Sequence, residues 1–195
     1  MKLLYTKRSP YARKVRIMAA EKRIALDLID EDLQHKSERL LKANPLGKVP
    51  TLILDDGTTI FDSRVICQYL DALDDKTMLI PGNPVDRVEV LKWEAFADDL
   101  MTAAIYLYME KVRHPHDFHQ QFVTTQEGNI SLAYAHIEKN LGPLKKNFDL
   151  AAIAVVSALG YGQFRLPHMT LPEGVSRWVN ELSKRPSVAQ TIPVA

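Results

Sequence analysis

The chain has 195 residues, a length that corresponds to one large domain or to two small ones that share an interface. Hydrophobic residues make up 46% and charged residues 25% of it, as in ordinary globular proteins, so a disordered or fibrous chain is excluded. The 25 basic residues nearly cancel the 24 acidic ones, and no strong positive field remains to collect nucleic acid or anionic lipid. We therefore expect a small molecule held by a local site, and neither nucleic acid nor membrane as a partner.

Three further features concern the compartment. The longest apolar run, residues 150–159, is about half the ~20 residues that a bilayer span requires. The apolar start of the chain, Met1 to Tyr5, is too short for a secretory signal, so we expect a cytoplasmic protein. The single cysteine, Cys67, excludes a disulfide within the chain and a cysteine zinc site.

Strand and helix signals alternate through the first part of the chain. Short apolar runs predict strands, apolar residues at three- and four-residue spacing predict helices, and Ser9-Pro10 is typical of a helix start. Asp55-Asp56-Gly57 between two apolar runs predicts a hairpin, because such a turn requires positive φ values. The predicted order is β-α-β-α-β-β-α, with strands at 2–6, 24–30, 51–54 and 58–61, and helices opening at 9–10 and covering 37–43 and 63–73.

A linker and a purely helical region follow. Asp74-Asp75-Lys76 and Pro81-Gly82-Asn83-Pro84 are typical of a linker, and strand signals vanish after them. Apolar residues from Trp93 to Tyr108 repeat at helical spacing, which predicts a long helix over 85–111 with one buried face. Further helices are predicted over 118–140, 149–163 and 174–184. We expect an α/β domain of residues 1–76, a linker of residues 77–83 and an all-helical domain of residues 84–195.

Two segments carry a resemblance to a known family. Residues 44–52 read Asn-Pro-Leu-Gly-Lys-Val-Pro-Thr-Leu, and residues 62–70 read Asp-Ser-Arg-Val-Ile-Cys-Gln-Tyr-Leu. In this order, ahead of a helical region, they resemble the soluble glutathione transferase superfamily. Ser9-Pro10 and the terminal Arg185-Pro186-Ser187 resemble a bacterial subgroup of it. The resemblance implies a thioredoxin-like domain followed by a helical bundle domain, reduced glutathione as co-substrate, and a homodimer.

Ser9 is the candidate for stabilising the glutathione thiolate. A free thiol has a pKa near 8.5, and lowering it by about two units requires ~2.7 kcal/mol of preferential stabilisation. One hydrogen bond to a charged partner supplies roughly 1.5–3 kcal/mol, and a helix N-terminus adds about 0.3–1 kcal/mol. The Ser9 hydroxyl therefore suffices without ionising, although Ser9 also fits a simple helix cap. Tyr5 is an alternative, because other branches of the family use a tyrosine at the end of the first strand, and Thr6 is another.

The other glutathione contacts follow from the shape of the tripeptide and from the resemblance. Asp62 can pair with the γ-glutamyl ammonium, and Ser63 with the free amides of its helix can accept the neighbouring carboxylate. Both residues also fit a helix N-terminus alone. The resemblance implies that Pro50 is cis and that the Val49 backbone pairs with the cysteinyl backbone like an added strand. It also places His35 and Lys48 near the glycyl carboxylate.

The predicted reaction is attack of the glutathione thiolate on a small hydrophobic electrophile, as in detoxification. Sulfur-containing and aromatic side chains of the long helix suit varied apolar ligands. The candidates for lining the acceptor pocket are Met101, Tyr106, Tyr108, Met109 and Arg113. Met101 and Tyr108 also belong to the predicted core face. The alternative is a non-enzymatic glutathione-binding or interaction protein, because a fold does not establish an activity.

Four other features have simpler interpretations. The histidines at 114–119 lack a zinc-ligand spacing, and we expect no metal. Cys67 is expected in the core, with a thiol–disulfide role as a third hypothesis. Asp149 is expected to cap a helix without a reciprocal carboxylate at Ala152. The basic residues around the first helix are expected on a solvated face or a dimer rim: Lys7, Arg8, Arg13, Lys14 and Arg16.

Overall fold

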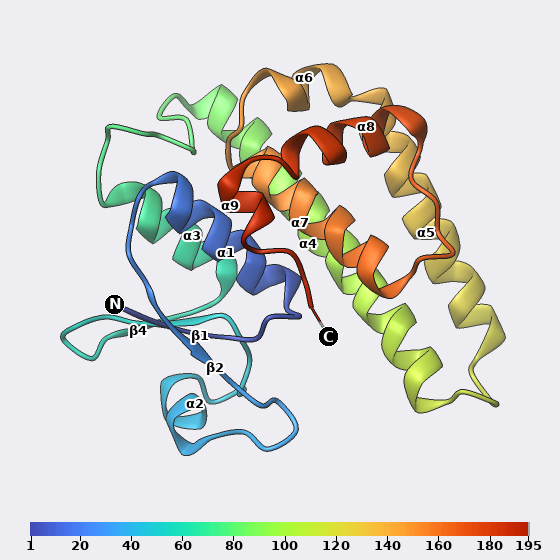
Figure 1. Ribbon diagram of the computed structural model, residues 1–195, viewed down its shortest axis with the longest axis horizontal. Coiled ribbons are helices and arrows are strands. Elements are labelled where there is room, and N and C mark those ends of the chain that lie inside the picture. Colours follow the sequence, from blue (N-terminus) through green and yellow to red (C-terminus); the bar gives the residue numbers. More distant parts are fainter. Residues whose placement is uncertain (195) are drawn as a thin grey trace.

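The computed structural model describes residues 1–194 and shows a small sheet beside a group of helices (Figure 1). The strands are β1 (Lys2–Tyr5), β2 (Asp27–Asp30), β3 (Thr51–Ile53) and β4 (Thr59–Ile60), arranged in the order β2-β1-β3-β4. β1 runs parallel to β2 and antiparallel to β3, which in turn is antiparallel to β4. The parallel pair requires a crossover connection, and α1 (Pro10–Glu21) supplies it.

Helices cover both faces of this sheet. α1 and α3 (Ser63–Ala72) lie on the face toward the helical region, and α2 (Glu38–Ala43) lies on the other (Figure 1). Because successive side chains of a strand point to opposite faces, Leu3 packs in the main core, whereas Leu4 packs with Leu40 of α2. The predicted order β-α-β-α-β-β-α and the thioredoxin-like domain are confirmed.

Positive φ values occur in three connections of this domain, and two of them set where a strand begins or turns. Arg23 (φ 56°) lies two residues after the end of α1, and the next N–H, that of Ile24, donates to Ala19 O at 2.8 Å. Ile24 was expected to begin a strand, but this hydrogen bond holds it in the turn after α1. β2 therefore begins at Asp27. In the β3–β4 hairpin Gly57 has φ 88°, as the predicted turn requires, and the Leu54 N–H donates to Thr58 O at 2.8 Å.

The second region contains helices of very different lengths. They are α4 (Pro84–Arg113), α5 (Gln120–Lys139), α6 (Leu141–Lys146), α7 (Leu150–Arg165), α8 (Glu173–Leu182) and α9 (Pro186–Ala189). The four longest were expected, and Asp149 caps α7 by accepting the Ala152 N–H at 3.2 Å. α6 and α9 were not expected. α6 contains Gly142 and Pro143, which usually interrupt a helix, but proline is tolerated in a first turn.

α7 lies at the centre of the molecule and explains the longest apolar run of the sequence. Every residue from Leu150 to Leu159 is buried, because α7 packs against α1 and α4. In the part of the chain that the structure describes, no helix is long and apolar enough to cross a membrane.

Lys22 holds the connection between the two regions. Its Nζ donates to three backbone carbonyls, those of Asp71 at 2.8 Å, Asp74 at 2.9 Å and Thr77 at 2.8 Å. The Asp71 carboxylate accepts the N–H groups of Leu79 at 2.9 Å and Ile80 at 3.1 Å. The segment between α3 and α4 is therefore fixed by buried hydrogen bonds.

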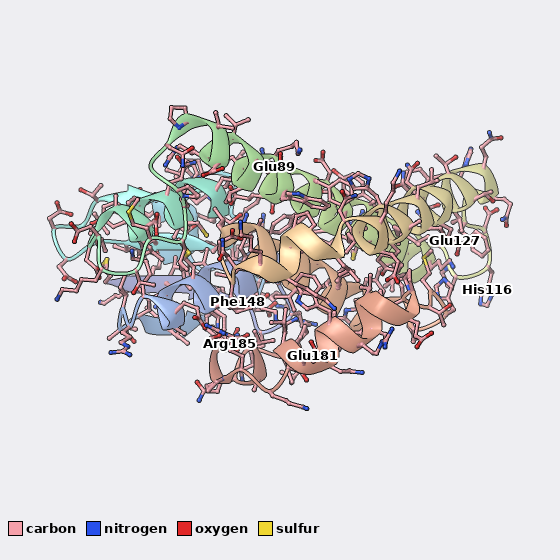
Figure 2. The ribbon with its side chains drawn as sticks, turned by 90° about the horizontal axis from the view of Figure 1, so that it is seen from above. Glu89, His116, Glu127, Phe148, Glu181 and Arg185 are labelled. Atoms are coloured by element: carbon pink, nitrogen blue, oxygen red, sulfur yellow. The ribbon has the colours of Figure 1, made fainter. Side chains whose placement is uncertain are left out.

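The last residues of the helical region lie along α1, and we call residues 185–191 the C-terminal strap. At one end Arg185 donates two hydrogen bonds, at 2.9 and 2.7 Å, to the carboxylate of Glu21 in the last turn of α1. Figure 2 shows Arg185 beside Phe148, with Cζ 4.2 Å from the ring centroid. Burial alone raises the pKa of Glu21, but the bonds from Arg185 and Ser187 outweigh it and hold this pKa below its ordinary value.

At its other end the strap meets the first turn of α1. The buried guanidinium of Arg13 donates to Val188 O at 3.4 Å and Thr191 Oγ1 at 3.5 Å, and to Val156 O of α7 at 3.4 Å. Burial lowers the pKa of Arg13 to about 10, which still leaves it charged at neutral pH. The strap therefore runs antiparallel to α1, toward the helix end that carries Ser9 (Figure 1).

Candidate active site

Ser9 is the N-cap of α1, as its Ser-Pro sequence predicts. Its Oγ accepts the Ala12 N–H at 3.2 Å, and Pro10 occupies the first helical position. No hydrogen bond within residues 1–194 uses the Ser9 hydroxyl proton as donor. The side chain is half-buried. A proton at a positively polarised helix end is thus available for an anion.

The two alternative thiolate stabilisers are differently placed. The Tyr5 ring is buried, with Arg16 Cζ 5.1 Å above its centroid. Thr6 is buried as well, and its Oγ1 accepts the Ser9 N–H at 3.2 Å. Of the three hydroxyls, that of Ser9 belongs to the least buried residue and stands directly at the helix end.

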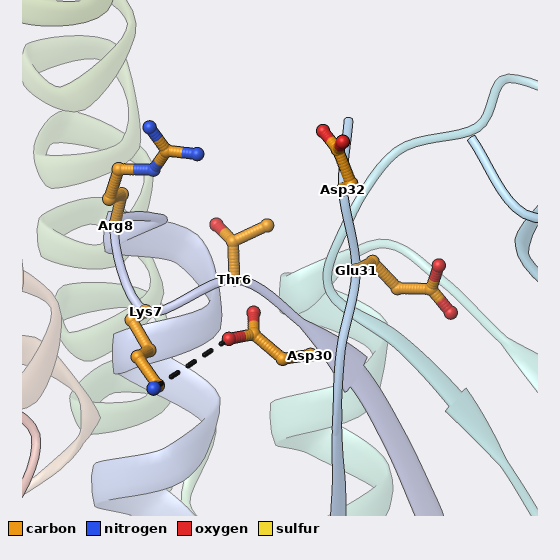
Figure 3. Close-up of a pocket in the computed structure, with 6 residues that line it drawn as sticks. All are labelled: Thr6, Lys7, Arg8, Asp30, Glu31 and Asp32. Atoms are coloured by element: carbon orange, nitrogen blue, oxygen red, sulfur yellow. Dashed lines mark ion pairs between the residues drawn. The ribbon is translucent and has the colours of Figure 1, made fainter. Parts of the chain in front are cut away.

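A hollow of about 530 Å³ lies between the segment that follows β1 and the end of β2 (Figure 3). Thr6, Lys7 and Arg8 line it from the segment that follows β1, and Asp30 to Asp32 line it from the end of β2. Lys7 Nζ and Asp30 Oδ2 are 3.9 Å apart within it. Neither Ser9 nor any of the six predicted glutathione contacts lines this hollow.

Val49 and Pro50 form the loop that enters β3. Their peptide bond is cis, as the resemblance implies. Lys48 O is occupied by Asn44 Nδ2 at 3.1 Å and by Thr51 Oγ1 at 2.9 Å. The backbone groups of Val49, in contrast, make no hydrogen bond within residues 1–194, and the β1–β3 ladder begins at Thr51. An extended peptide can therefore pair with Val49.

Asp62 and Ser63 stand at the N-terminus of α3. Asp62 is exposed, and its Oδ1 accepts the Arg64 N–H at 3.0 Å, so it is the N-cap that the sequence allows. Ser63 is buried. Arg64 Nε donates to Asp98 Oδ2 of α4 at 2.7 Å, which ties this helix end to the second region. The placement leaves free amides and a carboxylate at one helix end, as a zwitterionic group requires.

His35 and Lys48 are less constrained. The His35 side chain is 84% exposed, and its Nδ1 lies 2.8 Å from Asp32 Oδ2. Its hydrogen bond is the main cause that lowers the pKa of the exposed Asp32. Lys48 is exposed, and none of residues 1–194 pairs with its ammonium group. Both residues remain candidates for a carboxylate contact made only when a ligand is present.

The basic residues of α1 are a correction to the sequence analysis. Lys14 is fully buried, and its Nζ lies 2.8 Å from Glu94 Oε1 and 2.8 Å from Asp98 Oδ1. Arg13 is buried beneath the strap. The solvated face expected for this cluster is therefore wrong for these two residues. Charges at positions 94 and 98, four apart within an apolar helix face, were the signal for a buried partner.

Cys67 lies under this ionic network. Its side chain is completely buried, and burial raises the pKa of its thiol far above the ordinary value. A protonated, inaccessible thiol neither attacks disulfides nor forms mixed disulfides readily. The structure favours the core role expected for Cys67.

The five acceptor candidates on α4 divide into three groups. Met101 is wholly buried in the core and has no surface for a ligand, which overturns its expected lining role. Tyr106 and Arg113 are exposed. Tyr108 and Met109 are half-buried, and Tyr108 faces the end of α7, with Arg165 Cζ 4.4 Å from its ring centroid.

Four polar side chains meet between α1, α4 and α7. Only one of them, Tyr108, was assigned a role by the sequence analysis. We call them the tyrosine–arginine cluster, which consists of Tyr11, Tyr108, Tyr161 and Arg165. The Tyr11 hydroxyl lies 2.6 Å from Thr102 Oγ1 of α4. Burial is the main cause that raises the pKa of Tyr161 to about 12. The charge of Arg165 acts to lower this pKa, and Tyr108 and Tyr11 act to raise it. Tyr11 follows Ser9 by two residues, so the cluster begins at the candidate thiolate site.

No three His, Cys, Asp or Glu side chains within residues 1–194 are arranged to hold a metal ion. The histidines at 114, 116 and 119 are all exposed, and His119 Nδ1 accepts the Phe122 N–H at 3.1 Å and caps α5. These residues therefore form a helix start and the loop before it.

Comparisons with known proteins identify the family of this chain. Residues 8–73 match the family model of the glutathione S-transferase N-terminal domain. A glutathione transferase family member from Pseudomonas fluorescens Pf-5, solved with bound glutathione, superimposes with a TM-score of 0.91 at 35% identity, covering 100% of this chain and 99% of that one. A structure of the P. fluorescens family member with bound S-(propanoic acid)-glutathione gives a TM-score of 0.90 at 34% identity with the same coverage.

Two more relatives cover almost the whole chain. A glutathione S-transferase from Methylobacillus flagellatus KT, solved with glutathione bound, has a TM-score of 0.90 at 36% identity and covers 99% of both chains. The uncharacterized GST-like protein YibF of Escherichia coli (strain K12) is 31% identical over 99% of this chain and 98% of its own. With this identity, the matching N-terminal model and the shared fold, the chain belongs to the glutathione transferase family.

Proposed function

We propose that this protein is a glutathione transferase that joins the sulfur of reduced glutathione to a small hydrophobic electrophile. The Ser9 hydroxyl carries the proposal. It stands at the N-terminus of α1, and its proton is not used by any of residues 1–194. Relatives of the same fold bind glutathione, and that property supports the same ligand here.

In the proposed mechanism, the thiolate is formed when the glutathione thiol loses its proton to solvent. The Ser9 hydroxyl donates a hydrogen bond to the sulfur, and the end of α1 adds its positive potential. The sulfur electron pair then forms a bond to the electrophilic carbon, and the leaving group departs with the pair that bound it. Ser9 itself is neither ionised nor covalently changed.

The remaining assignments orient the tripeptide. The unpaired Val49 backbone next to cis-Pro50 would hold the cysteinyl backbone. Asp62 and Ser63 would hold the γ-glutamyl end, and the Arg64–Asp98 pair supports their helix from below. His35 and Lys48 would approach the glycyl carboxylate from the rim. In this proposal residues 1–76 bind glutathione, and residues 84–195 cover it with the acceptor site.

The first test is a thermal melt in the presence of reduced glutathione and of an S-alkyl glutathione. At about one hundred times its Kd, a ligand that binds only the folded state adds ~2.7 kcal/mol. For a chain of this size, that corresponds to a rise in Tm of roughly 5–10 °C. The absence of a shift with either ligand at millimolar concentration would contradict the proposed site.

The second test replaces the hydroxyl of Ser9. In Ser9→Ala we expect the pKa of the bound glutathione thiol to rise by about one to two units, because one hydrogen bond to a charged group is lost. Ultraviolet absorbance of the thiolate measures this pKa, and turnover at pH 7 should fall in parallel. Ser37→Ala is the matched control, since Ser37 caps α2 by accepting the Leu40 N–H at 3.1 Å. Equal thiol pKa values in Ser9→Ala and the wild type would direct attention to Tyr5 and Thr6.

A second candidate function is a non-enzymatic glutathione-binding or interaction protein. It predicts the same stabilisation by glutathione, but no acceleration of any conjugation over the uncatalysed reaction. A screen of electrophiles with different leaving groups, with Ser9→Ala as control, separates the two.

The proposal includes a homodimer formed through α3 and α4. Exposed apolar side chains on these helices and just before α3 support it, namely Phe61, Val65, Val85 and Val88. An interface through these helices would cover such side chains. Analytical ultracentrifugation of the wild type and of Val88→Asp tests the assignment, and a monomeric wild type would overturn it.

The remaining parts of the proposal concern the cellular context. We assign the protein to the cytoplasm, where glutathione is kept reduced and where the one free cysteine would stay a thiol. Detoxification of electrophiles is the role that follows from the proposed reaction. The Ser9-Pro10 start of α1 supports membership of the bacterial Ser-Pro subgroup. Neither a metal, nor nucleic acid, nor a membrane takes part in the proposed reaction.

A further inference from the structure

Arg165, the last residue of α7, lacks the anionic partner that other restrained arginines have. Its guanidinium carbon lies 4.4 Å from the ring centroid of Tyr108 and 4.1 Å from that of Phe164. Its Nε is buried and makes no hydrogen bond, and no carboxylate within residues 1–194 pairs with it. A buried N–H without an acceptor is unfavourable unless a ligand or a solvent molecule satisfies it.

Other arginines that are held in place have carboxylates at hydrogen-bonding distance. Arg39 Nη2 lies 2.8 Å from Glu31, Arg64 Nε lies 2.7 Å from Asp98, and Arg185 Nη2 lies 2.7 Å from Glu21. Arg165 is held by aromatic rings instead. Stacking fixes the plane of the guanidinium group and leaves its terminal N–H groups at the partly exposed edge, where an anion can approach.

The position of Arg165 connects it to the candidate active site. One turn and a half earlier on α7, Gly160 packs against the Arg13 guanidinium of α1. Tyr161 follows, four residues before Arg165 and therefore on the same face of α7, the helix that packs against α1. Tyr11, at one end of the tyrosine–arginine cluster, is two residues from Ser9. Arg165 lies at the other end, so the cluster extends from the proposed thiolate to Arg165.

We propose that Arg165 binds an anionic group, in particular a carboxylate, on the acceptor substrate. This inference rests on the proposed function, because it assigns the substrate class of the same site. A carboxylate fits the guanidinium edge with two parallel hydrogen bonds. Tyr161, which keeps its proton at neutral pH, is a second donor to the same group. The preferred acceptor is thus a small electrophile with an acidic substituent.

The test uses two conjugates that differ in charge and hardly in shape. S-(2-carboxyethyl)glutathione carries the anion, and S-(2-carbamoylethyl)glutathione carries a neutral amide in its place. Isothermal titration calorimetry at pH 7 gives the two Kd values. Since hydrogen bonds to charged groups are the strong ones, we expect the wild type to bind the carboxylate about 10- to 100-fold more tightly.

Substitutions at position 165 should remove this preference. In Arg165→Met the ratio of the two Kd values should approach one, with the amide conjugate bound as before, and Arg165→Lys should restore part of the preference. The control is Arg177→Gln, which removes the same charge from an exposed position of α8 and should leave the ratio unchanged. If Arg165→Met weakened the binding of both conjugates by the same factor, Arg165 would have a merely structural role and the inference would be overturned.

The same titrations distinguish the two proposals. If the wild type binds both conjugates with equal Kd, the glutathione site stands and the anionic acceptor is refuted. If neither conjugate binds, the proposed function fails, and the inference fails with it. Salt gives an independent readout, since raising the ionic strength should weaken the carboxylate conjugate more than the amide.

Discussion

Replacement of Lys14 by methionine tests whether the buried ionic network holds the two regions together. The Lys14 side chain has no exposed surface, and those of Glu94 and Asp98 are 2% and 7% exposed. Burial acts to lower the pKa of Lys14, but the charges of Asp98 and Glu94 outweigh it and raise this pKa. Methionine keeps most of the volume and removes the charge.

The magnitude follows from the carboxylates that remain. Arg64 still pairs with Asp98, but Glu94 has no other cation within 4 Å among residues 1–194 and would be left buried and unpaired. Removing one partner of a buried ion pair costs about 3–5 kcal/mol. For a chain of this size, that lowers Tm by roughly 6–20 °C.

Urea denaturation at pH 7, followed by tryptophan fluorescence, gives the free energy of unfolding. Lys92→Met is the matched control on the same helix, because Lys92 pairs with Glu89 at side-chain exposures of 62% and 55%, where a pair is worth about 0–1 kcal/mol. The loss in free energy of unfolding caused by Lys14→Met should also become smaller as the pH falls, because the unpaired Glu94 carboxylate binds a proton more readily in the folded than in the unfolded state. A Lys14→Met variant as stable as Lys92→Met would refute the reasoning.

Three other predictions concern stability and access. Gly160→Ala should lower the free energy of unfolding by about 1–3 kcal/mol in urea denaturation, because the new methyl group would overlap the Arg13 guanidinium. The control is Gly128→Ala on α5, where the methyl group meets nothing within 4 Å, and it should be neutral or stabilising. The pKa of Glu21 is lowered in the folded state, so the stabilisation that its carboxylate provides is complete above the unfolded pKa of about 4.3 and is lost below it. The difference in free energy of unfolding between the wild type and Glu21→Gln, clear at pH 7, should therefore shrink toward pH 3. A difference that stays constant with pH would contradict this sign. Cys67 is wholly buried with a raised thiol pKa, so a thiol reagent should label it only as fast as the protein unfolds, and rapid labelling of the folded protein would revive its thiol–disulfide role.

Local signals were sufficient for most of the fold. Helix caps, a hairpin glycine and the spacing of apolar residues act over a few positions, and they predicted the order of strands and the four long helices. Ser9, Asp62 and Asp149 cap the helices whose starts they were expected to mark. The short helices α6 and α9 have too few residues to show a period and depend on packing against longer neighbours.

The side-chain environment of the site was harder to predict, because its partners are distant in the sequence. Lys14 was expected in solvent, but its acids lie 80 and 84 positions away. Met101 was expected to line a pocket, although its position in the apolar period places it in the core. Arg165 ends a helix that reads as core throughout, and only the approach of Tyr108 from α4 distinguishes it.

The C-terminal strap has a consequence for how the chain acquires its structure during synthesis. The N-terminal α/β region emerges from the ribosome first, and domains generally begin to fold in that order. Yet the carbonyl and hydroxyl groups of the strap that satisfy Arg13 belong to Val188 and Thr191, which are 175 and 178 residues further along the chain. Until they arrive, one face of α1 carries a charged group without its partners, so the nascent first region remains open there. The packing of this face of α1, next to Ser9, is thereby coupled to the synthesis of residues 188–191.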